Sequence, residues 1–261
     1  MAVKLYILLI CLLPLTTAEA FDHTYRDYGL LLAEVVVPKG HQTRVDYAAL
    51  KRQSNRLDKL AAEFSHVPLS TYTTWNSEQQ LAFLINAYNL FTLQLVTRHY
   101  PGIDSIKDIG GFFGNPWKVR FFSLFGEKQH LDHIEHELIR NTFPEPRIHF
   151  ALVCAAISCP PLVKTPYQGA RLDEQLATVT HQFLTDPERN RYRSDDNVLE
   201  LSSLFKWYKK DFISHSGSLV AFVAPYLFLD NAAAAEDLVH ADPVIQFLPY
   251  DWSLNRVPNN D

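Results

Sequence analysis

Cysteine is scarce in this chain, and long apolar runs are absent beyond its first residues. Only two of the three cysteines, Cys154 and Cys159, lie after residue 20. A chain of this length needs no disulfide to fold, and a bridge between these two would restrict the unfolded chain only modestly, because the loop it closes is short. No later apolar run approaches the length of a membrane span.

Clusters of basic residues are also missing. The 261 residues include 24 Lys and Arg against 29 Asp and Glu, for a net charge of −5. Binding to nucleic acid depends on clustered cations that displace counterions from phosphates. The composition therefore argues against a nucleic-acid partner.

The N-terminus has the features of an export signal. Lys4 supplies the positive charge, residues 5–15 form a short apolar core, and residues 18–20 fit a small-x-small cleavage site. The apolar core is too short for a stable membrane anchor. We expect cleavage near Ala20 and a periplasmic or secreted mature chain of 241 residues (261 minus 20), with no membrane span.

The rest of the chain shows neither repeats nor low-complexity linkers. Alternation over residues 117–131 predicts a hairpin that turns near Gly126, and apolar residues at helical spacing predict several helices. The fold class we expect is α+β: a mostly helical single domain with a small antiparallel sheet or hairpin and a buried central helix. The expected division is 1–20 signal peptide, 21–45 N-terminal segment, 46–255 domain and 256–261 tail.

The strongest helical pattern covers residues 77–99. A capping box from Ser77 to Gln80 opens it, and apolar residues surround its axis, which is typical of a buried central helix. Asn86 and Asn89 lie one turn apart inside this pattern. Each must find hydrogen-bond partners in the interior. They are candidates for an oxyanion contact or for orienting a histidine, or else they cap loop backbone.

Residues 147–161 are the most informative stretch, because His149, Cys154 and Cys159 lie within an apolar segment that two prolines end. Its alanine content favours a buried helix over a buried strand. The thiolate is both the nucleophilic and the metal-binding form of cysteine, and a nearby imidazole can generate it. The stretch therefore indicates a site for chemistry.

Four motifs, at residues 81–89, 131–136, 149–160 and 250–255, resemble the successive motifs of the domain-of-unknown-function 547 family. The resemblance covers about residues 46–255. It implies that the chain shares the family's fold and is one of its exported bacterial members. It implies no settled activity. In the family's pattern serine can replace the second cysteine, which directs attention to Cys154.

A thiol hydrolase needs a nucleophile, a base, an orienting group and oxyanion donors. Cys154 supplies the thiol. On a helix His149 would lie about 140° around the axis from Cys154, so His136, on another element, is the better base. Glu135 is the predicted orienting group, and Asn86 or Asn89 the polar support. The predicted function is thus an exported cysteine-dependent hydrolase or acyl-transfer enzyme acting on a peptide or amide substrate.

Other interpretations stay open. Cys154 and Cys159 could form a structural disulfide in a non-catalytic exported binding domain, since export favours disulfides. Imidazoles and thiols are ligands that zinc accepts, and a metal site is an alternative, although the spacings match no zinc signature. The carboxylates Asp132 and Glu135 could also form a catalytic pair, although a capping box that starts a short helix to Arg140 explains them more simply. We expect no cofactor and no metal, and as partner an unknown peptide or small-molecule substrate.

Overall fold

The computed structural model describes residues 21–111 and 114–258. The expected signal peptide lies outside the described residues. Among the described helices none combines the length and the apolar character needed to cross a membrane.

A long buried helix organises the domain. Helix α5 (Ser77–His99) runs through the molecule, and every residue from Leu81 to Thr97 is buried. Burial on all sides follows from its apolar surface and confirms the predicted central helix. The capping box is displaced by one residue from the prediction: Asn76 accepts from the Gln79 backbone N–H, and Gln79 bonds back to Asn76.

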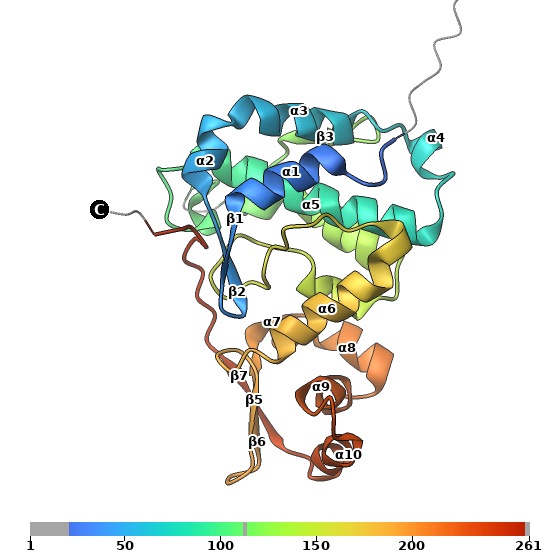
Figure 1. The fold of residues 1–261 in the computed structure, drawn as a ribbon, viewed down its shortest axis with the longest axis vertical. Coiled ribbons are helices and arrows are strands. Elements are labelled where there is room, and N and C mark those ends of the chain that lie inside the picture. Colours follow the sequence, from blue (N-terminus) through green and yellow to red (C-terminus); the bar gives the residue numbers. More distant parts are fainter. Residues whose placement is uncertain (1–20, 112–113, 259–261) are drawn as a thin grey trace, which may run out of the picture.

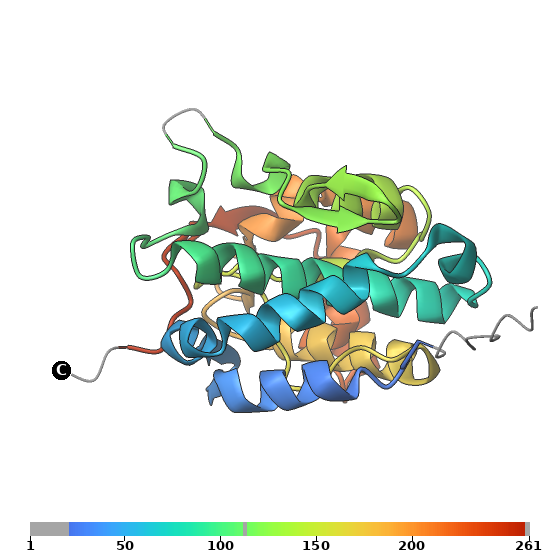
Figure 2. The same ribbon diagram turned by 90° about the horizontal axis from the view of Figure 1, so that it is seen from above.

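Elements that precede α5 in the chain pack against it. Helix α3 packs along it, with the rings of Phe64 and Phe83 stacked 5.3 Å apart, and α6 lies on another side (Figures 1 and 2). Asp46 caps α2 by accepting a hydrogen bond from the Ala49 backbone N–H. The elements that precede α5 are α1 (Arg26–Val35), β1 (Val36–Lys39), β2 (Gln42–Val45), α2 (Tyr47–Arg52), α3 (Ser54–Ser65) and α4 (Leu69–Tyr72).

The middle of the chain supplies short elements beside α5. The hairpin predicted near Gly126 is formed by β3 (Phe122–Leu124) and β4 (Glu127–Gln129). The 3₁₀ turns η1 (Ile106–Asp108) and η2 (Pro116–Lys118) precede the hairpin. The π-helix η3 (His133–Arg140), the 3₁₀ turns η4 (Pro146–Phe150) and η5 (Gly169–Arg171) and helix α6 (Leu172–Leu184) follow it.

The C-terminal part forms a second group of elements under α6 (Figure 1). It contains β5 (Arg191–Arg193), β6 (Val198–Ser202), α7 (Ser203–Trp207), α8 (Lys209–Ser216), α9 (Leu219–Leu227), α10 (Ala232–His240) and β7 (Val244–Leu248). The described sheets are the antiparallel pairs β1–β2 and β3–β4, and β5–β6–β7, in which β6 and β7 are parallel. The α+β, mostly helical prediction is confirmed.

Two local predictions were wrong in detail. Asp132 makes no capping hydrogen bond, and the helix that follows is a π-helix. The segment that begins at Pro146 is helical only as far as Phe150. Asn89 on α5 then binds the Ala151 carbonyl and the Val153 N–H, which directs those backbone groups to a side chain instead of to a helix.

Candidate functional site

A pocket of about 200 Å³ lies beside α5. Four of the six predicted site residues line it: Glu135, His136, His149 and Cys154. The remaining walls come from α5, η2, the residue before η3, the loop after η4, α7 with the residue that follows it, and the C-terminal segment. The residues concerned are Tyr88, Trp117, Asp132, Leu152, Cys159, Pro160, Leu204, Trp207, Tyr208, Tyr250 and Trp252. Elements distant in sequence therefore contribute to one cavity.

The two asparagines do not line this pocket. The Asn86 side chain donates to the Tyr167 carbonyl (2.7 Å) and accepts from the Tyr167 N–H (2.9 Å). Asn89 makes the same pair of bonds, to the Ala151 carbonyl and the Val153 N–H, each at 2.9 Å. Both amides are buried and hold loop backbone against α5. Of the roles considered from the sequence, the structure assigns them that of backbone caps.

Cys154 and Cys159 lie side by side as free thiols. Their sulfurs are 2.7 Å apart, and the Cys154 backbone N–H donates to the Cys159 sulfur at 2.8 Å. The Tyr250 hydroxyl contacts the Cys154 sulfur at 3.2 Å. Cys159 is buried, whereas Cys154 is partly exposed. Each thiol therefore has the other as its nearest polar neighbour.

The two thiols differ in acidity. The hydrogen bond to Cys159 together with burial raises the pKa of Cys154 well above the ordinary thiol value. Burial alone would raise the pKa of Cys159, but hydrogen bonds from the thiol and backbone N–H of Cys154 outweigh it and lower that pKa. The first proton to leave the pair is thus that of Cys159, and Cys154 donates to the resulting thiolate.

Glu135 does not orient a histidine. It is buried, and the Tyr208 hydroxyl donates to its Oε1. The Tyr208 ring in turn stacks on the His149 ring, with centroids 3.8 Å apart. His136 is the next residue along η3, and adjacent residues of a helix point in different directions. The His136 ring therefore has other neighbours than the Glu135 carboxylate.

His136 is held by arginine. The Arg140 Nη1 group lies 2.9 Å from His136 Nδ1. A guanidinium can only donate, so Nδ1 is the acceptor and the neutral ring carries its proton on Nε2. Nε2 faces Asp132, whose Oδ1 is 4.0 Å away. His136 therefore presents a hydrogen-bond donor in the pocket, which differs from the general-base role predicted from the sequence.

Asp211 binds His149 directly and is linked to His136 through Arg140. It accepts two hydrogen bonds from Arg140, at 2.7 and 2.9 Å, and one from His149 Nε2 at 2.8 Å. The bonds from His149 and Arg140 hold the pKa of Asp211 well below its ordinary value. Burial lowers the pKa of His149, although Asp211 opposes the shift. His149 is thus a neutral donor to a charged carboxylate.

Aromatic side chains form the rim of the pocket. Trp207 and Trp252 stack with centroids 5.5 Å apart, and Tyr250 lies 4.5 Å from Trp252. The Lys107 ammonium sits 3.7 Å from the centroid of the Trp252 ring. Trp207 remains 46% exposed, so it offers an apolar surface beside the thiols.

Sequence reasoning missed several residues of this arrangement. Arg140 follows His136 by four positions, a spacing that puts both on one helix face, and that signal was available. Tyr208 and Asp211 lie on α7–α8, a region that reads from the sequence as a solvated, weakly basic surface. No spacing links them to η3. Within the ranges 21–111 and 114–258, no three His, Cys, Asp or Glu side chains are grouped so as to hold a metal ion.

A family model described as "Protein of unknown function, DUF547" matches residues 72–184. This match supports membership of the DUF547 family. The match contains both thiols, both asparagines and the Glu135–Arg140 stretch, whereas Tyr208, Asp211 and Tyr250 lie after it. No match is found among curated proteins or among solved structures.

Proposed function

We propose that the pocket is the active site of a cysteine-dependent hydrolase or acyl-transfer enzyme, exported from the cell, that acts on a peptide or amide substrate. The supporting observation is the placement of Cys154: it is partly exposed, lines the cavity, and has a sulfur neighbour able to take its proton.

Cys159 is the proton acceptor in this proposal. As its thiolate takes the Cys154 proton, the Cys154 sulfur forms a bond to the substrate carbonyl carbon and the carbonyl π-electrons move to oxygen. The two sulfurs are already in contact, so proton transfer needs no rearrangement. The raised pKa of Cys154 makes such an acceptor necessary, because the free thiolate is rare at neutral pH.

His136 is the donor to the developing oxyanion. Its Nε2–H is directed away from Arg140, and the ring is fixed before substrate arrives. Asp132 is placed to protonate the leaving amine as the C–N bond breaks, since burial raises its pKa and so keeps the carboxyl protonated to higher pH. Water, or another nucleophile, then releases the acyl group from Cys154.

The roles of Glu135 and His149 are to position neighbours. Glu135 anchors the Tyr208 hydroxyl, and the Tyr208 ring covers His149. His149 fixes Asp211, which holds Arg140 and through it the His136 ring.

The test is hydrolysis of a panel of peptide amides by the wild type, Cys154→Ala and Cys159→Ser. We expect Cys154→Ala to lose about 1,000-fold or more of the turnover, as nucleophile removal does elsewhere. Cys159→Ser should acylate more slowly at neutral pH but still form a Cys154 acyl adduct, detected by mass spectrometry of the intact chain.

Turnover that survives in Cys154→Ala would refute the proposal. The alternative, a binding domain with a structural Cys154–Cys159 disulfide, is favoured by the contact between the two sulfurs. It predicts that the native, non-reduced protein has no titratable thiol at these positions. A zinc site, the remaining alternative, predicts stoichiometric zinc in protein purified without added metal and a strong fall in Tm on chelation.

A further inference from the structure

We infer that Cys154 and Cys159 form a thiol–disulfide exchange site, which takes a small, flexible disulfide as substrate and returns it as two thiols. This activity uses the same two sulfurs as the proposed hydrolase but requires neither His136 nor Asp132, and it stands independently of that proposal.

The first support is the contact between two thiols of unequal exposure. A disulfide bond is about 2.0 Å long, and the two sulfurs are 2.7 Å apart as free thiols. Bond formation therefore needs only a small movement. Both cysteines line the cavity, but Cys154 is partly exposed whereas Cys159 is only 2% exposed. An incoming disulfide therefore meets the Cys154 sulfur first, which fixes the order of attack.

The second support is the way the loop between the cysteines is held. Its backbone pairs with the C-terminal segment: the Ile157 N–H donates to the Ser253 carbonyl at 2.8 Å, and the Ser158 N–H to the Asp251 carbonyl at 3.1 Å. A bridge between Ala156 and Leu254 continues the pairing. The loop is thus anchored by backbone bonds that do not involve either sulfur.

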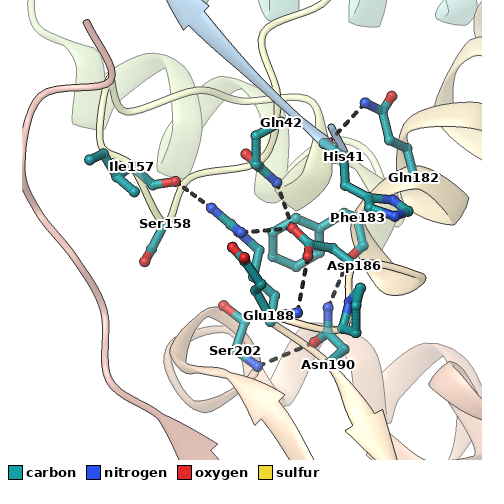
Figure 3. A network of polar contacts seen from close by, with 12 residues as sticks. His41, Gln42, Ile157, Ser158, Gln182, Phe183, Asp186, Glu188, Asn190 and Ser202 are labelled. Carbon is teal, nitrogen blue, oxygen red and sulfur yellow. Dashed lines mark hydrogen bonds and ion pairs between the residues drawn. The ribbon is translucent and has the colours of Figure 1, made fainter. Parts of the chain in front are cut away.

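A buried ion pair anchors the same loop from its other side (Figure 3). The Arg189 guanidinium donates to the Ile157 carbonyl and, at 2.7 Å, to Asp186 Oδ2. Gln42 from β2 also donates to Asp186, at 3.0 Å. Both charged side chains are more than nine-tenths buried. Since these contacts are independent of the sulfurs, the loop can keep both cysteines adjacent in the dithiol and in the disulfide state.

The exchange balances in two steps. The Cys154 sulfur attacks one sulfur of the substrate disulfide RSSR, so the Cys154–SR bond forms, the substrate S–S bond breaks, and RS⁻ leaves with the proton that Cys154 gave up. Cys159 then gives up its proton and its sulfur attacks the Cys154 sulfur, so the Cys154–SR bond breaks and the second RS⁻ leaves and takes up that proton. The two cysteines are oxidised to a disulfide and RSSR is reduced to two RSH. Excess RSH reverses both steps.

The Cys159 site suits the second step. Its sulfur receives the Cys154 N–H at 2.8 Å, which stabilises negative charge on the resolving thiol. The Tyr250 hydroxyl lies against the attacking sulfur instead. The pair therefore contains an accessible attacking thiol and a shielded resolving thiol.

The test uses oxidised glutathione with the pre-reduced wild type, Cys159→Ser and Cys154→Ser, followed by peptide mapping with mass spectrometry. The wild type should form the Cys154–Cys159 disulfide with no lasting adduct. Cys159→Ser should retain one glutathione on Cys154, because the resolving thiol is missing. Cys154→Ser should stay unmodified, because Cys159 is shielded.

A second measurement needs no variant. In glutathione buffers of graded ratio, both thiols of the wild type should disappear together and return when reduced glutathione is in excess. Three results would overturn the inference: a wild type that forms no internal disulfide, an adduct on Cys159 in Cys154→Ser as fast as on Cys154 in Cys159→Ser, or an internal disulfide that excess reduced glutathione cannot open in the folded protein. The readout is mass, so exchange and amide hydrolysis can fail separately.

Discussion

The asparagines of α5 and the side chains of the pocket are both polar groups in an apolar interior, yet they are satisfied in opposite ways. Asn86 and Asn89 bind loop backbone, and each amide pairs with a donor and an acceptor on one peptide segment. Beside the pocket, by contrast, the Asp211 carboxylate accepts hydrogen bonds from the side chains of both His149 and Arg140.

This difference distinguishes side chains that stabilise the fold from side chains that can take part in chemistry. A side chain that closes backbone hydrogen bonds is fully committed, and its removal leaves buried groups without partners. Side chains that bind each other beside a cavity can change protonation or partner when a substrate enters. The two regions should therefore respond differently to substitution: the asparagines through stability, the pocket through reactivity and pH dependence.

The largest effect that we expect in this comparison is on stability. Asn89→Ala leaves the Ala151 carbonyl and the Val153 N–H without their partner, at a cost of about 1–3 kcal/mol for each group. Urea denaturation followed by fluorescence measures the free energy of unfolding.

Thr92 on the same helix is the matched control. Its hydroxyl is buried and has no hydrogen-bond partner among the described residues, so Thr92→Val should be neutral or stabilising. If Asn89→Ala and Thr92→Val lose the same stability, the backbone-capping role is wrong.

The next effect is on the pH dependence of stability. Burial depresses the folded-state pKa of His149 below the unfolded value of about 6.5. The contribution of neutral His149 to the free energy of unfolding is complete above the unfolded-state pKa. It is lost as pH falls from there through the folded-state pKa, with a slope of at most about 1.4 kcal/mol per pH unit. The pKa of Asp211 is also lowered, by His149 and Arg140, so its contribution to the free energy of unfolding is lost at more acid pH.

His149→Gln keeps a donor for Asp211 but removes the titration. We expect the free energy of unfolding of the wild type to fall more steeply between about pH 7 and 5 than that of His149→Gln, whatever their absolute values. Parallel curves from urea titrations across this range would show that His149 does not resist protonation in the folded state.

The smallest effect concerns Tyr250. Its hydroxyl bond lowers the pKa of Cys154, so Tyr250→Phe should leave less thiolate and slow alkylation by iodoacetamide roughly 2- to 10-fold at neutral pH, the range of one hydrogen bond. Stability should change little, because the ring and its packing remain. Alkylation as fast as in the wild type would remove Tyr250 from the thiol site.

Much of the fold followed from local pattern. The apolar surface of residues 77–99 required a buried helix, and burial of Asn86 and Asn89 followed from their position in it. The hairpin at Gly126 was likewise local. The capping box was misplaced by one residue because Asn76 and Ser77 are both good caps. The helix expected from residue 147 ended at Phe150, because Asn89, 62 residues away from Ala151, binds its backbone.

By itself the sequence determined which segments are buried and which reactive groups lie in them, because hydrophobic periodicity is a property of neighbouring residues. It identified Cys154, Glu135, His136 and His149 as candidates. Only the tertiary structure decided their partners. Tyr208 reaches Glu135 across 73 positions, and Tyr250 reaches Cys154 across 96. Such contacts depend on how distant elements pack, and no local spacing encodes them. The contact between His136 and Arg140 is local by contrast, and the distant contribution there is Asp211, which holds the guanidinium that makes His136 a donor in place of a base.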